Sequence, residues 1–313
     1  MNIMLTGASG FVGTNLLKSL AHDSNKIFAL GRNFHHKKVE NVNYYKIDLL
    51  SPEMSELKEK MGNNQIEVII HAAGQAHIPQ TAKNKTKFVL NNVEVTKQIL
   101  NLARELGAKK FIFLSSVSVL DCDLNDIYAQ TKRESEKLVI KFCLEFDIIY
   151  TIIRPVLIYG ENDEKGNMVK LIKQIRKGIF LIVNKGHNIK NILYIGNLVH
   201  MTSLILDSDD WDNRILLARD KFDLSILDIC CIIKKELDNK CLFVSISSGL
   251  LNAIASSIDI SQSIGMFKSI NAKSLKRLSK DVVFEVEGAN KELVDHLPFT
   301  SCEGIARTVH WYK

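Results

Sequence analysis

Three side chains near the middle of the chain could together move a proton. Tyr128 and Lys132 are four positions apart in a segment with helical spacing, so they share one face of the expected helix. A tyrosine with an ordinary pKa of about 10 is a weak base at neutral pH, but a nearby ammonium group favours its phenolate. Ser116, in "FLSS", could hydrogen-bond the reacting oxygen. These three residues therefore predict acid–base chemistry.

The start of the chain carries a glycine loop that could bind a pyrophosphate. "TGASGFVG" places Gly7, Gly10 and Gly13 between a short apolar run and a helical pattern. Gly7 permits a tight turn, Gly10 lets the backbone approach a pyrophosphate at the helix N-terminus, and Gly13 allows close helix packing. Because the loop opens an alternating strand–helix pattern, it predicts a dinucleotide site. The positive nicotinamide of an oxidised dinucleotide would further favour the phenolate of Tyr128.

The end of the second expected strand bears on which dinucleotide binds. An acid there would hold the ribose 2′-hydroxyl, whereas an arginine accommodates a 2′-phosphate. The sequence reads "FALGR", with Arg32 and no acid, which favours NADP over NAD; an ordinary exposed arginine is the alternative interpretation. Asp48, after the third expected strand, is placed either to accept from the adenine amino group or to cap a helix.

The elements that must position these residues alternate along the first half of the chain. Helical patterns separate short apolar runs, expected as buried strands, at residues 2–6, 26–30, 43–47, 67–73, 110–116 and 150–156. Such alternation predicts a parallel, doubly wound α/β sheet of the Rossmann type. Further on, helices mix with shorter strands such as 214–218. We expect a dinucleotide-binding domain over 1–160 and a smaller mixed α/β substrate lobe over 161–313, between which the chain is free to cross back.

Composition excludes several other classes of protein. Hydrophobic side chains make up 46% of the 313 residues and charged ones 24%, and the net charge of +6 is spread over lysines often paired with acids, so we expect no nucleic-acid partner. No segment offers the roughly 18 apolar residues that span a bilayer. Because "MNIMLTG" enters the first expected strand at once, we expect no signal peptide. The six cysteines contain no C-x-x-C pair. These features predict a cytoplasmic protein with reduced, mostly buried thiols, no membrane insertion and no metal.

Several motifs together resemble one family. The chain is similar to extended short-chain dehydrogenases/reductases of the nucleotide-sugar epimerase/dehydratase group in "TGASGFVG", "HAAG", "NNVEVT", "FLSS", "YAQTK", "RPVLIYG" and "EGIARTVHWYK". The similarity covers essentially the whole chain. Within the group, the chain most resembles bacterial surface-polysaccharide enzymes that act on UDP-linked N-acetylhexosamines or their 4-keto-6-deoxy derivatives. The resemblance implies catalytic roles for Ser116, Tyr128 and Lys132, and it permits a homodimer packed through the helix that carries Tyr128.

The resemblance also implies positions for cofactor and substrate. The residues expected at the cofactor are Gly7, Ser9, Gly10, Phe11, Val12, Gly13, Arg32, Asp48, Leu49, Ala72, Ala73, Gly74, Asn92, Tyr128, Lys132 and Pro155. Substrate contacts are expected at Ser116, Asn167 and Lys190. Lys190 replaces a usual diphosphate-binding arginine, so it keeps the charge but loses the bidentate fork. Simple surface positions are the alternative for Asn167 and Lys190.

The chain departs from the family pattern at three places. Only eleven residues, 117–127, separate Ser116 from Tyr128, where the family commonly has a longer insertion that often touches the sugar. Val95 stands where a glycine is usual, and Gly196 where an aspartate is usual. These differences bear mainly on the identity of the substrate.

The residues beside the serine bear on the reaction. A dehydratase usually has an Asp-Glu pair there, but this chain has Val117 and Ser118, which disfavours dehydration. Hydride transfer at C4 of a hexose then serves an epimerase or a ketoreductase, and the hard chemistry of both belongs to the nicotinamide. Arg32 favours the NADPH-using reductase slightly. A non-catalytic dinucleotide sensor or scaffold on the same fold is the alternative from another class.

Overall fold

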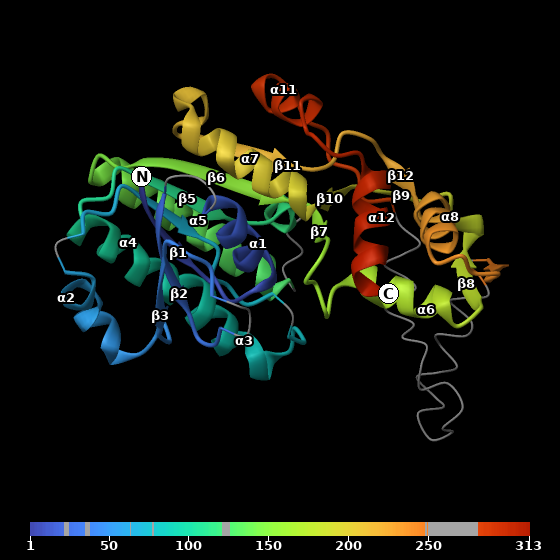
Figure 1. Ribbon diagram of the computed structural model, residues 1–313, viewed down its shortest axis with the longest axis horizontal. Helices are drawn as coiled ribbons and strands as arrows, with labels where there is room; N and C mark the ends of the chain where they lie inside the picture. The colour runs from blue at the N-terminus through green and yellow to red at the C-terminus, as the bar shows by residue number, and fades with distance from the viewer. Residues whose placement is uncertain are drawn as a thin grey trace. The chain divides into compact units, whose positions relative to one another are not determined.

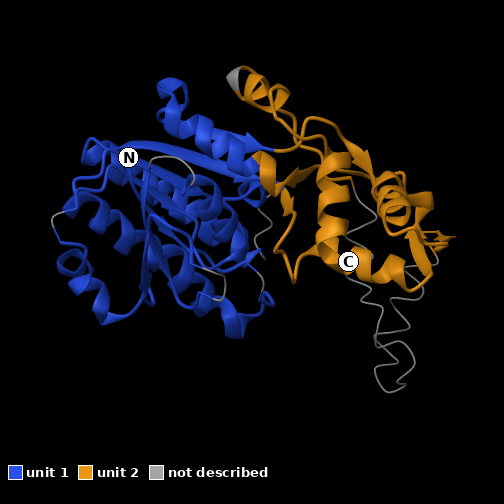
Figure 2. Ribbon diagram, in the orientation of Figure 1, with its two compact units in different colours: residues 1–156, 198–218 blue, residues 157–197, 219–313 orange. Residues whose placement is uncertain are grey.

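The computed structural model describes residues 1–21, 25–34, 38–62, 64–76, 78–120, 126–247, 249 and 281–313. These residues form two compact units, the first made of 1–156 with 198–218 and the second of 157–197 with 219–313 (Figure 2). Segment 198–218 lies in the range expected for the smaller lobe, yet it belongs to the first unit. The chain therefore enters the second unit, returns to the first, and leaves it again.

A seven-stranded parallel sheet forms the centre of the first unit (Figure 1). Its order is β11-β6-β5-β4-β1-β2-β3, and every neighbouring pair is parallel. The strands are β1 (Asn2–Thr6), β2 (Lys26–Gly31), β3 (Val42–Lys46), β4 (Val68–His71), β5 (Lys110–Leu114), β6 (Ile149–Pro155) and β11 (Arg214–Ala218). The first six follow the apolar runs of the sequence, and the expected Rossmann-type doubly wound fold is confirmed.

The seventh strand comes from the segment that was expected in the smaller lobe. β11 pairs in parallel with β6, so that Leu217 lies opposite Arg154 and Ala218 opposite Pro155. Leu216, Leu217 and Ala218 are buried there. A short apolar strand can be buried at the edge of any sheet that other elements cover. The sequence of 214–218 therefore does not indicate which sheet the strand joins.

Helices flank this sheet. They are α1 (Phe11–Leu20), η1 (Pro52–Glu56), α2 (Leu57–Met61), α3 (Ala82–Phe88), the π-helical η2 (Val89–Glu94), α4 (Val95–Glu105), η3 (Val117–Val119), α5 (Ile127–Glu145), α7 (Ile195–Asp207) and η5 (Asp209–Trp211). Helix α7 begins in the second unit and continues in the first. Ile99 of α4 and Val139 of α5 join Phe111 and Ile152 of the sheet in one fully buried core.

The strand order places a ligand edge at the carboxyl ends of β1 and β4. β1 lies between β2 and β4, so the direction of chain progression reverses there. Open α/β sheets bind ligands in the crevice at such a point. The glycine loop follows β1, and "HAAG" begins at the end of β4. The fold therefore brings both segments to one edge.

The second unit combines short strands with helices. They are β7 (Leu157–Tyr159), α6 (Asn167–Arg176), β8 (Ile179–Val183), η4 (Asn184–Gly186), β9 (Ile189–Lys190), β10 (Ile192–Tyr194), β12 (Leu224–Ser225), α8 (Ile226–Glu236), β13 (Leu242–Ile246), α11 (Ala289–Asp295) and α12 (Ser301–Tyr312). Three two-stranded sheets pair β10 with β7, β12 with β9 and β13 with β8. Ser225 and Thr300 start α8 and α12 with capping boxes.

The cysteines of the described residues are free. Cys143, Cys230 and Cys241 are buried, and Cys231 and Cys302 are exposed. The sixth, Cys122, lies outside the described residues. Burial raises the pKa of the Cys143 and Cys230 thiols to about 12, so both stay protonated at neutral pH.

Candidate functional site

The glycine loop is held by close backbone contacts. Gly7 has φ of +69°, and a Cβ at this position would lie 2.8 Å from the backbone of Ala73. A Cβ on Gly13 would lie 2.1 Å from the carbonyl oxygen of Gly7. Both positions therefore require glycine, which lets the loop, α1 and the segment after β4 approach one another. Gly10 is the N-cap residue of α1, whose first-turn N–H groups have no intrahelical partner and suit an anion.

A cleft opens at this edge of the first unit. It is lined by Gly7, Ser9, Gly10, Leu30, Gly31, Arg32, Ile47, Asp48, Leu49, Ala72, Ala73, Gly74, Gln75, Asn91 and Val95. Nine of the residues expected at the cofactor are among these. Phe11, Val12, Gly13, Asn92, Tyr128, Lys132 and Pro155 do not line it.

Arg32 and Asp48 both reach the cleft from exposed positions after β2 and β3. One carboxylate oxygen of Asp48 accepts from the backbone N–H of Leu50 at 3.0 Å, which fixes the turn that follows β3. The helix-capping position considered for Asp48 belongs instead to Ser51, the N-cap residue of η1, and Asp48 faces the cleft. Arg32 is the cation that the structure places at the end of β2.

The structure brings Ser116 and Tyr128 together. Ser116 follows β5 and is buried, and its hydroxyl lies near enough to that of Tyr128, at the start of α5, to favour the Tyr128 phenolate. The hydroxyls of Ser116 and Ser118 are 3.1 Å apart, and the Ser118 N–H donates to Ser116 Oγ at 3.2 Å. Asp126 caps α5 by accepting from the N–H of Ala129 at 2.9 Å. Residues 121–125 of the short connection between Ser116 and Tyr128 lie outside the described residues.

Lys132 lies one turn further along α5 and is buried. Its ammonium donates to the carbonyl of Leu114 at 2.7 Å and lies 4.7 Å from the centre of the Phe113 ring. A Cβ on Gly74 would be 3.2 Å from this ammonium. Lys132 is therefore adjacent to a residue of the cleft, although it does not line the cleft itself.

Burial shifts the pKa of both groups on α5. It raises the pKa of Tyr128 to about 12, against the hydrogen bond with Ser116, and the Asp126 carboxylate adds to the rise. Burial lowers the pKa of Lys132 to about 8, and the Glu136 carboxylate opposes that shift. The direction at Tyr128 differs from the one expected from a neighbouring ammonium, because desolvation of the phenolate dominates among the protein's own groups. A further positive charge beside Tyr128 is needed to make it a base.

Asn92 connects the cleft to α5. It is buried in the π-helical η2, a type of turn that is frequent at functional sites. Its Oδ1 accepts from the N–H of Gln75 at 2.7 Å, and its Nδ2 donates to Thr131 Oγ1 at 2.9 Å. Thr131 stands directly before Lys132. Asn92 therefore fixes the helix that carries Tyr128 and Lys132 against the segment after β4.

The two expected substrate residues lie in the second unit. Asn167 is the first residue of α6 and is exposed. Lys190 is half-buried in β9; burial lowers its pKa, and Asp281 opposes this shift.

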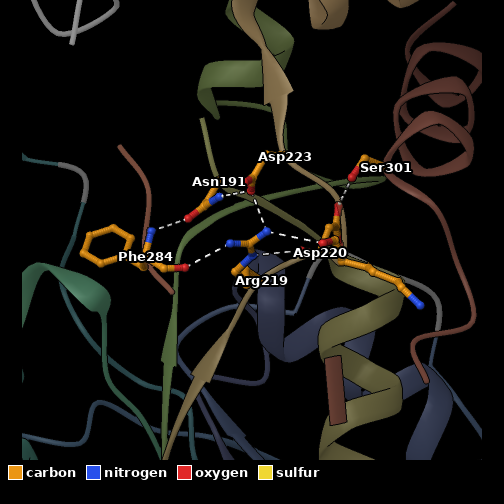
Figure 3. Close-up of polar contacts among 7 residues, drawn as sticks. Asn191, Arg219, Asp220, Asp223, Phe284 and Ser301 are labelled. Carbon is orange, nitrogen blue, oxygen red and sulfur yellow. Dashed lines mark hydrogen bonds and ion pairs between the residues drawn. The ribbon is translucent and has the colours of Figure 1, made fainter. Parts of the chain in front are cut away.

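A polar network holds the chain beside Lys190 (Figure 3). Asn191 donates to the Asp223 carboxylate at 2.5 Å and accepts from the Phe284 N–H at 2.5 Å. The buried Arg219 donates to the same carboxylate and to the carbonyls of Asp220 and Phe284 (Figure 3). The guanidinium of Arg219 is thus engaged in holding these segments.

Neither a metal cluster nor a membrane span is found in the described part of the chain. No three His, Cys, Asp or Glu side chains gather there so as to hold a metal. No helix among the same residues is long and apolar enough to cross a bilayer.

A family model matches the part of the chain that contains the residues of this site. The model of the NAD dependent epimerase/dehydratase family matches residues 3–216, which include the glycine loop, Ser116, Tyr128 and Lys132. The chain belongs to this family. Extended short-chain epimerases are therefore its relatives, as the sequence motifs predicted.

Named relatives of this epimerase/dehydratase family member include 4-epimerases. UDP-glucose 4-epimerase of Vibrio cholerae is 29% identical, and the match covers 73% of this chain and 73% of that protein. N-acetyl-alpha-D-glucosaminyl-diphospho-ditrans,octacis-undecaprenol 4-epimerase of Escherichia coli O157:H7 is 25% identical, with coverage of 99% and 95%. UDP-glucose 4-epimerase of Thermus thermophilus, solved with NAD, has a TM-score of 0.74 at 15% identity, with coverage of 100% and 99%. At that identity, the structural likeness concerns the fold.

Sequence reasoning missed several residues that line the cleft of this family member. They are Leu30, Gly31, Ile47, Gln75, Asn91 and Val95. Gly31 offered a signal, because a glycine ending the second strand permits close approach, and a Cβ there would lie 2.8 Å from Ser9 Oγ. Gln75 directly follows "HAAG". Leu30, Ile47 and Val95 carry no such signal, because apolar residues occur equally in a buried core and in the wall of a cleft.

Proposed function

We propose that the protein is an NAD(P)-dependent nucleotide-sugar epimerase or ketoreductase. It transfers hydride at C4 of a UDP-linked hexose, N-acetylhexose or 4-keto-6-deoxy derivative, in the synthesis of a surface polysaccharide such as O-antigen or capsule. One observation carries the proposal. The Ser116 hydroxyl acts on that of Tyr128 so as to favour its phenolate, and Tyr128 precedes the buried Lys132 by one helical turn, in a member of the NAD dependent epimerase/dehydratase family.

The cleft fits a dinucleotide. Gly7 and Gly13 admit no Cβ, and the N-terminus of α1 faces the same loop, as pyrophosphate binding requires. Arg32 would contact a 2′-phosphate, and Asp48 the adenine. The nicotinamide, when bound, supplies the hydride acceptor and donor of the reaction. We infer a preference for NADP over NAD from Arg32, although structural neighbours such as the Thermus enzyme were solved with NAD.

Tyr128, Ser116 and Lys132 divide the proton chemistry among them. Tyr128 takes the proton of the C4 hydroxyl during oxidation and returns it during reduction. Ser116 holds both the Tyr128 hydroxyl and the C4 oxygen. Lys132 contributes the fixed positive charge and bonds the ribose hydroxyls. Tyr128 has a pKa of about 12 in the protein alone, so the positive charge that an oxidised nicotinamide would supply when bound is needed to bring the phenol into working range.

Dehydration is disfavoured by what stands beside Ser116. Val117 is buried and apolar, and Ser118 is hydrogen-bonded to Ser116. Neither side chain can act as the carboxylate acid and base that remove water across C5 and C6. The reaction therefore stops at hydride transfer, either reversed on the opposite face of the sugar or completed once.

The sugar carrier has two candidates. Asn167 and Lys190 would contact a UDP-sugar. The relative that matches nearly full length on both sides is named for a sugar on undecaprenyl diphosphate, which shares the diphosphate with a nucleotide-sugar. The lipid-linked sugar is therefore the second candidate carrier for the same C4 chemistry.

Turnover assays separate these reactions. The protein is incubated with UDP-N-acetylglucosamine, with its 4-keto-6-deoxy derivative plus NADPH, and with N-acetylglucosaminyl diphosphoundecaprenol. Interconversion of C4 epimers without net cofactor loss identifies an epimerase, and stoichiometric loss of NADPH identifies a ketoreductase. Tyr128→Phe should abolish either. Failure of all three substrates, with dinucleotide still bound, would instead support a non-catalytic sensor or scaffold.

The same proposal includes a cytoplasmic homodimer. Leu144 on α5 is 66% exposed, and α5 is the helix that would pair with its copy. Size-exclusion chromatography with light scattering tests the dimer, and Leu144→Glu should shift it toward the monomer.

A further inference from the structure

A buried ion pair lies on the same helix as the candidate catalytic residues. Glu136 follows Lys132 by four positions on α5, so both project from one face of the helix. Glu136 is 4% exposed. Its carboxylate accepts two hydrogen bonds from the guanidinium of Arg154, from Nε at 2.9 Å and from Nη2 at 2.6 Å. Arg154 belongs to β6, and it directly precedes Pro155.

Burial of this pair is costly, so packing alone is a weak reason for it. A carboxylate and a guanidinium removed from water lose several kcal/mol each, and an apolar pair of similar size would often hold α5 on β6 as well. The bidentate geometry fixes the carboxylate in place, so that its charge acts from one defined position. That position is one turn from Lys132, which is itself buried and has its charge disfavoured.

The surroundings of Lys132 contain few groups that favour its charge. The carbonyl of Leu114 and the ring of Phe113 contact the ammonium from β5. The Lys132 charge acts on His71 of β4, Tyr128 lies one turn before Lys132 on α5, and Asn92 of η2 lies near it across Gly74. Glu136 is the carboxylate that acts on Lys132 in the described part of the chain. Arg154, behind Glu136, carries the opposite charge.

We propose that Glu136 is a positioning residue that keeps Lys132 protonated, and that Arg154 holds the Glu136 carboxylate in place for this purpose. The ion pair thereby sets the highest pH at which Ser116, Tyr128 and Lys132 work together. The inference deepens the proposed function and rests on it only for the catalytic consequence, because the charge of Lys132 can be measured without turnover.

Charge substitutions separate this role from simple packing. Glu136→Gln keeps the size of the side chain but removes the anion and leaves the Arg154 charge unpaired, so both changes disfavour the ammonium. In Glu136→Gln/Arg154→Gln both charges are gone, so the shift at Lys132 should be smaller than in the single variant but still present. If the pair only packed α5 on β6, neither variant would move the titration midpoint of Lys132.

The test is a titration of Lys132 followed by nuclear magnetic resonance of lysine labelled with 13C at Cε. Lys132→Met identifies the signal by its absence. An opposite charge at close range shifts a pKa by about one unit or more. Glu136→Gln should therefore lower the titration midpoint of Lys132 by about one pH unit, and the double variant should recover only part of that shift. Glu136→Asp with Arg154→Lys, which keeps both charges, is the matched control if the neutral variants fold poorly.

An unchanged midpoint in Glu136→Gln would overturn the inference, as would a double variant shifted further than the single one. In active protein, the alkaline limb of the kcat/KM profile should move down together with the midpoint in Glu136→Gln. If no sugar is turned over, the proposed function fails, while the titration still decides the role of Glu136.

Discussion

Acid should destabilise the first unit through one buried histidine. His71 ends β4 and is fully buried between Thr6 and Thr96. The hydroxyl of Thr96 donates to the Asn92 carbonyl at 2.6 Å, so it must accept from His71 Nε2, 3.0 Å away. His71 Nδ1 then accepts from the Thr6 hydroxyl at 2.7 Å. The fold therefore holds a neutral His71 protonated on Nε2.

The sign and size of the effect follow from its pKa. Burial, with Lys132 adding to it, lowers the pKa of His71 from 6.5 to about 3. Between pH 6.5 and about 3, the unfolded chain therefore binds a proton at His71 that the folded protein does not bind. The contribution of neutral His71 to the free energy of unfolding is fully present above pH 6.5 and is lost as the pH falls toward 3. At pH 4.5, two units below 6.5, the loss from this residue is about 2.7 kcal/mol, since one pKa unit corresponds to about 1.36 kcal/mol.

Urea unfolding at pH 7.0 and pH 4.5 measures this loss. Trp311→Phe leaves Trp211 as the tryptophan, so fluorescence reports the first unit. In this background His71→Gln should cost stability at pH 7.0, and the difference from the parent should shrink by about 2.7 kcal/mol at pH 4.5, because glutamine does not titrate. His187→Gln, at an exposed histidine, is the control for the substitution itself. Equal losses in the parent and in His71→Gln would refute the reasoning.

Three further substitutions test other parts of the structure. Gly74→Ala puts a methyl group 3.2 Å from the Lys132 ammonium and should weaken NADPH binding about tenfold or more, measured by fluorescence titration; unchanged affinity would place the cofactor elsewhere. The buried Asp220 accepts hydrogen bonds from four donors. Asp220→Ala should therefore lower the free energy of unfolding of the second unit by about 3 kcal/mol or more in urea unfolding, and a loss below about 1 kcal/mol would show that these hydrogen bonds do not stabilise the unit. The Lys110 ammonium lies 2.7 Å from the Asp212 carboxylate, and Lys110→Met should lower the free energy of unfolding by about 3 kcal/mol in urea unfolding, because it leaves the carboxylate unpaired. Lys110→Met/Asp212→Asn should lose less stability; a larger loss in the double variant would show that the two side chains stabilise the fold by packing and not by their charges.

The repeating and local features of this protein could be predicted from its amino-acid sequence. Six apolar runs predicted six strands of a parallel sheet, because strands buried on both faces read as continuous hydrophobic segments. The requirement for glycine at positions 7 and 13 was readable from the motif itself, although Gly7 makes its close contact with the distant Ala73. The four-residue spacing of Tyr128 and Lys132 was sufficient to place them on one face of a helix.

Features that depend on burial and on contacts distant in sequence were decided by the folded chain. Residues 214–218 read as a strand, yet their place beside β6 depends on where the returning chain meets a sheet edge. The pKa of Tyr128 moves upward, and Glu136 meets Arg154, because desolvation and ion pairing arise between elements that no spacing rule connects. The sequence thus provided the reactive groups, and their protonation states were set by the packed interior around them, where charges are costly and each neighbour counts.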